Sequence, residues 1–190
     1  EILAAVFART HGSTLAEALN ACPQVRIIAF EAIPDKAREV QSMFKDAQVL
    51  NYAVGETTGP VSFFIDGAHS ACSSLARSSP DVHEIIIPGT TLDQLIDRND
   101  VDLIKVDVEG AELGVVRGAE QLIARCRPTI MFESGPTEVL GYTKEAMHHW
   151  FTERGYGIFL PSRLPHPGPP MSLEVFVDSH VFPFRTLNYF

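Results

Sequence analysis

The sequence has no long hydrophobic run and no excess of positive charge. None of its apolar stretches approaches the roughly 18 residues that a membrane-spanning helix needs. The 190 residues include 15 Lys and Arg against 24 Asp and Glu, which gives a formal net charge of −9. Duplex nucleic acid and anionic membranes attract basic surfaces, so we expect neither as a partner of this acidic chain.

Cysteine is also scarce, and a secretory signal is missing. Cys22, Cys72 and Cys126 are odd in number and far apart, which favours reduced thiols over a disulfide framework or a zinc site. The first residues, EILAAVFART, have neither the basic region nor the small-residue cleavage site of a signal peptide, and no initiator Met. We therefore expect a cytoplasmic protein whose chain is trimmed at one or both ends.

Short apolar runs alternate with amphipathic segments along the chain. Strands are expected at 1–8, 25–31, 47–55, 59–66, 101–108 and 128–133, with an edge strand at 84–89. Helices are expected at 14–21, 33–44, 90–97, 111–124 and 142–155, followed by a less regular tail. Alternation of this kind, with continuously apolar strands, predicts a single α/β domain over residues 1–190. Its sheet should be mostly parallel, with helices on both faces.

Polar side chains stand where the predicted strands end. They are Glu31, Asn51, Asp107 with Glu109, and Glu133. In open parallel sheets, ligands bind beyond the carboxyl ends of the strands, near the switch in strand order. These residues are therefore the candidates for a binding site.

Glu31 closes the second strand about 20 residues after the first turn, the place where an acid can accept both hydroxyls of a ribose. A dinucleotide site would also need G-x-G-x-x-G in that first turn. The turn FARTHGST contains only Gly12, so a nicotinamide or flavin enzyme is disfavoured. S-adenosylmethionine is a nucleoside ligand without phosphates and does not need a pyrophosphate cradle.

One long stretch, VDLIKVDVEGAELGVVRGAEQLIARCRPTIMFE, strongly resembles the signature of the FkbM-type S-adenosylmethionine-dependent methyltransferases. The resemblance extends upstream through RIIAFEAIPD, LNYAVGETTGPVSFF and IPGTTLDQLI, and covers most of residues 23–135. It implies a class I methyltransferase fold, Rossmann-like, with a seven-stranded sheet. It also implies methyl transfer, usually to a hydroxyl oxygen.

The resemblance also implies roles for individual residues. Glu31 would hold the ribose of S-adenosylmethionine, with Ala32 beside the adenine. Asn51 and Ala53 would border the adenine ring, and Asp107 would lie beside the methionine portion and the reacting centre.

The first motif of the family departs from its expected form, Asp-x-Gly-Ala-x-x-Gly. If Gly12 is the last glycine of that motif, Val6 replaces the Asp and Ala8 replaces the first Gly. The lost Asp removes an anchor for the cofactor's amino group or for the loop. The methyl group of Ala8 lies where the backbone should come close to the cofactor.

The acids of DVEGAE leave several roles open. Methyl transfer to an alcohol needs a group that takes up a proton, and Asp107, Glu109 and Glu133 are the candidate catalytic residues. The same three carboxylates are also candidates for holding a divalent cation. Glu109 is equally well explained as an acid at a helix N-terminus, and we assign Glu112 to that role alone.

Histidines give weaker signals than the acids. His69 and His11 lie in loops that a catalytic site could use, but a solvated loop residue is the simpler interpretation. The sequence predicts that His148 and His149 lie on a helix surface. It places His180 beside a loop, without partners at metal-ligand spacing.

The sequence therefore predicts an S-adenosylmethionine-dependent O-methyltransferase that acts on a small-molecule or sugar-like acceptor. The acceptor would enter over the loops at 67–80 and 161–170, because loops on a rigid sheet carry specificity. The alternative is a catalytically degenerate module that keeps the fold and binds or supports another molecule. The altered first motif favours this alternative.

Overall fold

The computed structural model describes residues 2–7, 13–66, 82–108, 110–136, 138, 142–165, 168–181 and 186–190, with side chains from residue 15 on except at 63–66 and 82–83. Its strands are β1 (Ile2–Phe7), β2 (Arg26–Glu31), β3 (Gln48–Leu50), β4 (Ala53–Val54), β5 (Gly59–Asp66), β6 (Val82–Thr90), β7 (Leu103–Asp107), β8 (Thr129–Glu133) and β9 (Asn188–Tyr189). Its helices are α1 (Ser13–Ala21), α2 (Pro34–Met43), α3 (Leu92–Leu95), α4 (Glu112–Arg117), α5 (Glu120–Cys126), α6 (Lys144–Glu153), α7 (Leu173–Asp178) and a 3₁₀ turn at Pro161–Arg163. None of the described helices is long and apolar enough to span a bilayer.

The main sheet has the strand order β3-β2-β1-β7-β8-β9. Every neighbouring pair is parallel except β8 and β9, which are antiparallel. The chain therefore runs outward from β1 in one direction, crosses over, and continues from β7 in the other. This is the doubly wound pattern, and its switch point lies between β1 and β7.

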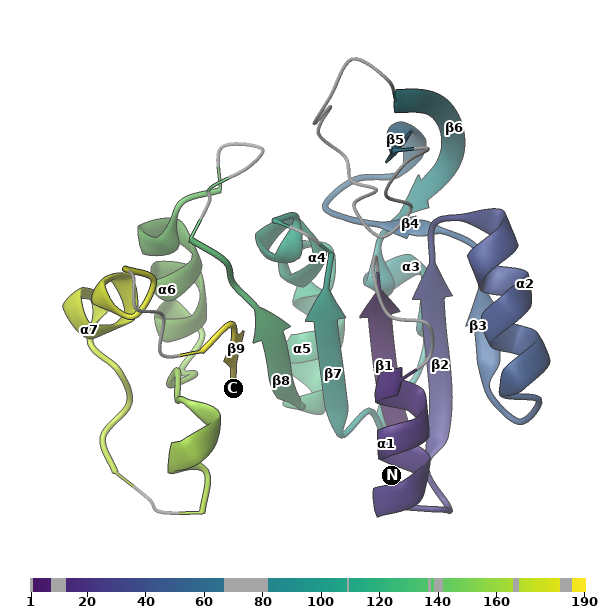
Figure 1. The fold of residues 1–190 in the computed structure, drawn as a ribbon. Helices are drawn as coiled ribbons and strands as arrows, with labels where there is room; N and C mark the ends of the chain where they lie inside the picture. Colours follow the sequence, from purple (N-terminus) through teal and green to yellow (C-terminus); the bar gives the residue numbers. More distant parts are fainter. Residues whose placement is uncertain are drawn as a thin grey trace.

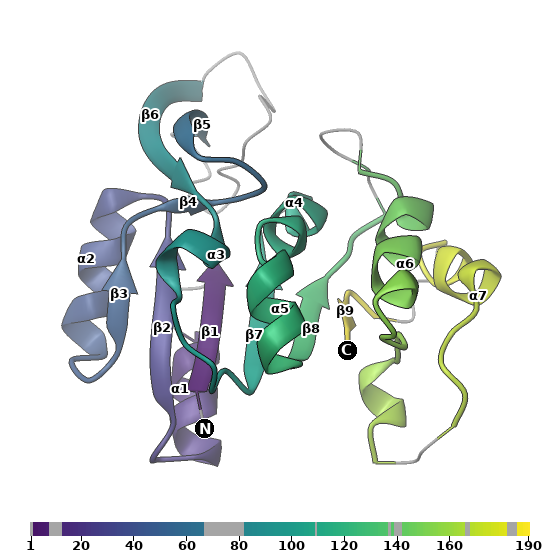
Figure 2. The same ribbon diagram turned by 180° about the vertical axis from the view of Figure 1, so that it is seen from behind.

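Helices cover both faces of this sheet, as the sequence predicts. In Figure 1, α1 and α2 lie in front of β1, β2 and β3, where Leu15 and Val40 pack against Ile27 and Ala29. In Figure 2, α3, α4 and α5 lie in front of the opposite face. The larger core is there, and it is built on the buried side chains of Ile104, Val106, Ile130 and Phe132.

A second, three-stranded sheet lies above the carboxyl ends of β1 and β2 (Figure 1). Its order is β4-β6-β5, so β6 is the central strand and the expected edge position of 84–89 is wrong. The strand expected at 47–55 divides into β3, in the main sheet, and β4, in this small sheet. The main sheet consequently has six strands in the described part of the chain, and the expected seven-stranded sheet is not found there.

The helix expected at 111–124 is also divided, into α4 and α5. Gly118 lies at the break, and a Cβ added to it would come within 2.0 Å of the Gly55 carbonyl oxygen. Only glycine allows this contact between the helix and the loop after β4. The two helices still share one inward face, on which Val115, Val116, Ala119, Leu122 and Ile123 are buried.

The C-terminal third is more regular than its sequence indicates. Helix α6 is capped at Thr143, whose Oγ1 accepts a hydrogen bond from the Ala146 amide, and Gly155 follows its end with a φ of 73°. The residues LEVFVD form α7, and residues 188–189 form β9. Both elements are short and each contributes one buried residue to the main core, Phe176 and Tyr189, so local periodicity gave no signal for them.

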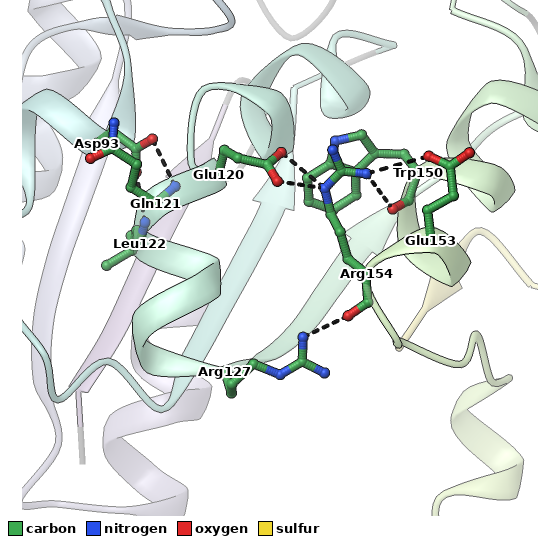
Figure 3. A network of polar contacts seen from close by, with 8 residues as sticks. All are labelled: Asp93, Glu120, Gln121, Leu122, Arg127, Trp150, Glu153 and Arg154. Atoms are coloured by element: carbon green, nitrogen blue, oxygen red, sulfur yellow. Dashed lines mark hydrogen bonds and ion pairs between the residues drawn. The ribbon is translucent and has the colours of Figure 1, made fainter.

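Polar contacts between helices fix the orientation of α5 (Figure 3). Arg154 donates from Nε to both carboxylate oxygens of Glu120, at 2.8 and 2.9 Å, and lies over the ring of Trp150. At the start of α5, the carboxylate of Asp93 accepts hydrogen bonds from the amides of Gln121 and Leu122, at 3.0 and 2.7 Å. Asp93 thus caps a helix whose own N-cap, Ala119, has no side-chain acceptor.

We predict that Asp93→Ala lowers the free energy of unfolding by about 1–2 kcal/mol, because two amides at a helix N-terminus lose their acceptor. Urea denaturation of the purified chain measures this change. Asp97→Ala is the matched control, because Asp97 is an exposed acid just beyond α3. Equal losses in the two variants would contradict the capping role.

Candidate functional site

The register of the main sheet brings two predicted acids to the same edge. Phe7, the last residue of β1, pairs with Glu31 on one side and with Asp107 on the other. Residues in register share a face of the sheet, so both acids lie on one face at the switch point. Both are buried, with 2% of Glu31 and 5% of Asp107 exposed.

Glu31 is held by backbone groups at the end of β2. Its Oε1 accepts a hydrogen bond from the Ile33 amide at 2.8 Å. Burial raises the pKa of Glu31, and the hydrogen bond from Ile33 opposes that rise only in part. A buried acid of this kind gains from any ligand hydroxyl that donates to its second oxygen.

Asn51 braces the same turn from the neighbouring strand end. Its Nδ2 donates to the carbonyl oxygens of Glu31 and Ala32, both at 2.8 Å. Both amide hydrogens are therefore used, and the Asn51 side chain can offer a ligand only its carbonyl oxygen.

The predicted adenine neighbours Ala32 and Ala53 come together in one apolar cluster. Ala32 and Ile33, after β2, pack against Ala53 of β4 and Ile87 of β6. The small sheet thus forms an apolar wall above the end of β2, a surface suited to a flat, largely apolar ring.

Asp107 has one bound and one unbound carboxylate oxygen. Its Oδ2 lies 2.9 Å from Nζ of Lys105, and both side chains are buried. Its Oδ1 is buried and finds no hydrogen-bond partner among the described residues. A buried oxygen without a donor destabilises the fold, so its retention points to a ligand that donates to it.

Glu112 has a larger role than the sequence assigned to it. It is the first residue of α4, as expected for a helix N-terminal acid, but only 4% of it is exposed. Its Oε1 accepts hydrogen bonds from the amides of Val108 and Gly110, at 3.2 and 3.0 Å. The carboxylate therefore holds the loop that follows Asp107, and burial raises the pKa of Glu112.

Of the remaining predicted residues, Glu133 lies at the end of the strand next to Asp107, since Val106 pairs with Phe132, and the others lie outside the described residues. Glu133 closes β8, is half-buried and is in register with Asn188 of β9. Glu109, Gly12 and the loop at 67–81 lie outside the described residues, and so does most of the altered first motif. In the part of the chain that the structure describes, no group of three or more acids, histidines or cysteines could hold a metal ion.

Sequence reasoning missed a polar pocket beyond the ends of β7 and β8. Its lining includes Gly110, Glu112, Ser134, Tyr142 and Lys144. Tyr142 also lines a neighbouring pocket under the small sheet, and its hydroxyl lies 3.3 Å from Oε2 of Glu56. These residues come from separate elements, and no local motif marks them.

Two histidines also differ from their predicted positions. His148 is buried on α6 rather than exposed, and its Nε2 lies 3.0 Å from the Met171 carbonyl oxygen. His180, which the sequence places beside a loop without partners at metal-ligand spacing, is buried against Ser134. Both partners are distant in the sequence, at separations of 23 and 46 residues, so spacing could not reveal them.

A doubly wound sheet with buried acids on both sides of its switch point is characteristic of Rossmann-like proteins that bind a nucleoside. The family model described as the Methyltransferase FkbM domain matches residues 6–158. The chain therefore belongs to the FkbM methyltransferase family, which confirms the predicted resemblance and implies S-adenosylmethionine as the methyl donor. A search of curated proteins found no match.

We predict that Glu112→Gln makes the free energy of unfolding less dependent on pH. Burial raises the pKa of Glu112 from its ordinary value of 4.5, so the folded chain binds this proton more tightly than the unfolded chain. Stability of the parent chain therefore falls as pH rises from about 4.5 through the folded pKa. Gln keeps an acceptor for both loop amides but removes this titration.

Urea denaturation at a series of pH values measures the effect. Glu17→Gln, at an exposed position of α1, should keep the slope of the parent chain. If Glu112→Gln also keeps that slope, Glu112 does not titrate as its burial requires.

Proposed function

We propose that the chain is an S-adenosylmethionine-dependent O-methyltransferase that methylates a hydroxyl of a small, sugar-like molecule. The observation that carries this proposal is the pair of buried acids, Glu31 and Asp107, on the two sides of β1. Family membership supplies the reaction class. The choice of a sugar-like acceptor and of a hydroxyl as the methylated group comes from the resemblance to the family.

The residues around Glu31 fit the nucleoside half of the cofactor. The second oxygen of the Glu31 carboxylate would accept from the ribose hydroxyls, while Ile33 holds the first. Adenine would lie against the wall that contains Ala32 and Ala53. Because both amide hydrogens of Asn51 are used, its carbonyl oxygen would accept from the exocyclic amino group of adenine.

Asp107 fits the methionine half, which carries a positive charge on its ammonium group and, before transfer, on its sulfur. The unpartnered Oδ1 offers an acceptor to such a cationic ligand, and Lys105 fixes the orientation of the carboxylate through Oδ2. When bound, the cofactor supplies an electrophilic methyl group. We assign Asp107 to holding this half beside the acceptor, and proton uptake by Glu109 or Glu133 stays a prediction.

The second candidate is a degenerate module that has lost catalysis. The altered first motif, with Val6 and Ala8 in place of Asp and Gly, favours it. The two candidates differ in cofactor affinity, since a degenerate module need not bind S-adenosylmethionine. A divalent cation is not needed by either candidate and remains a prediction from the acids of the motif.

We predict that Glu31→Gln weakens binding of S-adenosylmethionine and S-adenosylhomocysteine by about 10–100-fold. The physical reason is the loss of hydrogen bonds from the ribose hydroxyls to a charged acceptor, worth about 1.5–3 kcal/mol. Isothermal titration calorimetry measures both affinities. Glu39→Gln, at an exposed position of α2, is the matched control and should bind as the parent chain does. A folded parent chain that binds neither compound would refute the methyltransferase proposal.

We also predict that Asp107→Asn weakens S-adenosylmethionine more than S-adenosylhomocysteine, by about 10-fold or more for the first. The sulfonium charge is present only in S-adenosylmethionine, and the variant removes the anion that we place beside it. Asp102→Asn, an exposed acid just before β7, should leave both affinities unchanged. Unchanged binding together with a large loss of turnover would instead assign Asp107 as the base.

A further inference from the structure

Ser134 and His180 form a buried pair beyond the end of β8. Ser134 directly follows Glu133 and is 6% exposed, and His180 follows α7 and is 8% exposed. Ser134 Oγ lies 2.9 Å from His180 Nε2. Neither residue contributes to the cofactor contacts proposed above, so the pair is available for another role.

The second ring nitrogen shows which atom of His180 carries the proton. His180 Nδ1 lies 2.8 Å from the carbonyl oxygen of Phe176. A carbonyl oxygen only accepts, so Nδ1 is the donor, and in the neutral ring Nε2 is left with a lone pair. The hydroxyl of Ser134 must then donate to Nε2. A serine paired in this way with a histidine that a third group orients has the arrangement of an activated hydroxyl.

Aromatic contacts hold the His180 ring in this orientation. The ring stacks on Tyr189, with centroids 5.1 Å apart and planes at 17°. It meets Phe176 edge to face, with centroids 4.8 Å apart. These contacts leave the ring little freedom to rotate, and they keep Nε2 directed at Ser134.

Burial favours the neutral ring that proton uptake requires. It lowers the pKa of His180, while the hydrogen bond to the Phe176 carbonyl opposes this effect. The charged groups that act on the ring are Lys144, which lowers the pKa, and Glu138, which raises it. The net effect lowers the pKa of His180, which favours the neutral ring.

Ser134 borders the polar pocket that lies between the ends of β7 and β8. Gly110, three residues beyond Asp107, lies in the same lining, together with Glu112 and Lys144. Ser134 thus lines a pocket whose wall also includes the loop that follows Asp107.

We propose that Ser134 and His180 relay the proton of the acceptor hydroxyl, a role that rests on the methyl-transfer function proposed above. The acceptor hydroxyl donates to Ser134 Oγ, and Ser134 donates to Nε2. When the acceptor oxygen bonds to the methyl carbon, the bond from that carbon to sulfur breaks and its electron pair stays on sulfur. The acceptor proton moves to Oγ, and the proton of Ser134 moves to Nε2. The resulting imidazolium keeps its hydrogen bond to the Phe176 carbonyl.

Ser134 is therefore a catalytic residue in this proposal, and His180 is a positioning residue that acts through it. The first test needs no acceptor. Long-range ¹H–¹⁵N spectra of the full chain labelled at histidine, with His180→Gln to assign the signal, should show a protonated Nδ1 and an unprotonated Nε2 at pH 7. A proton on Nε2 would overturn the relay, because a protonated Nε2 could not accept the proton of Ser134.

The second test measures release of S-adenosylhomocysteine from S-adenosylmethionine with glycerol, myo-inositol, glucose or rhamnose as acceptor. Ser134→Ala and His180→Gln should each lower kcat by about 100-fold or more, the scale of general-base catalysis. The double variant should lose no more, because both residues serve one path. In the parent chain, protonation of His180 should lower kcat at acidic pH. The two single variants should not show this fall.

Controls separate the relay from folding and from cofactor binding. Ser134→Thr, which keeps the hydroxyl, should retain activity, and His149→Gln, at an exposed position of α6, should match the parent chain. Ser134→Ala should bind S-adenosylhomocysteine as the parent does. Normal turnover in Ser134→Ala and His180→Gln would overturn the relay and leave the proposed function intact. A parent chain that binds no cofactor, or that transfers methyl to none of these alcohols, would overturn the proposed function and the relay with it.

Discussion

Burying a carboxylate at the edge of a sheet costs stability unless donors meet its oxygens, and this cost organises the region around the switch point. Glu31 meets the amide of Ile33, and Glu112 meets the amides of Val108 and Gly110. Asp107 satisfies one oxygen with Lys105 and leaves the other unsatisfied. Glu31 and Glu112 therefore stabilise backbone turns, whereas Asp107 has a partner for only one of its two oxygens. That contrast distinguishes a residue that builds the site from one that awaits a ligand.

The two halves of the proposed cofactor meet different surfaces for a related reason. The small sheet supplies apolar residues above β2, where an uncharged ring would lie. At the end of β7, the carboxylate of Asp107 supplies a negative charge, beside which a cationic group of the cofactor would lie. Asn51 braces the turn that carries Glu31 and Ala32, because it donates both of its amide hydrogens to carbonyl oxygens there. A rigid turn lowers the entropic cost of ordering the site when a ligand binds.

Much of the fold could be predicted from the sequence, because long apolar strands and amphipathic helices carry local periodicity. The mostly parallel sheet, helix α6 with its cap at Thr143, and the polar residues at the ends of β2 and β7 follow from such patterns. The division of the segment at 47–55 could not be predicted, since both halves are apolar and only tertiary contacts assign them to different sheets. The pairing of Ser134 with His180 could not be predicted either, because the two residues are 46 positions apart. The chain around His180 also has no periodic signal.

The contact between Gly118 and Gly55 has a consequence for how this protein can vary. No side chain separates α4 from the loop after β4 at this point, so the spacing between them is set by backbone atoms alone. Substitutions elsewhere in the small sheet can change the shape and polarity of the pocket under it without changing that spacing. Gly118 therefore fixes this spacing, because a side chain at position 118 would push the loop away from α4, whereas a Cβ at position 55 would meet no atom within 4 Å.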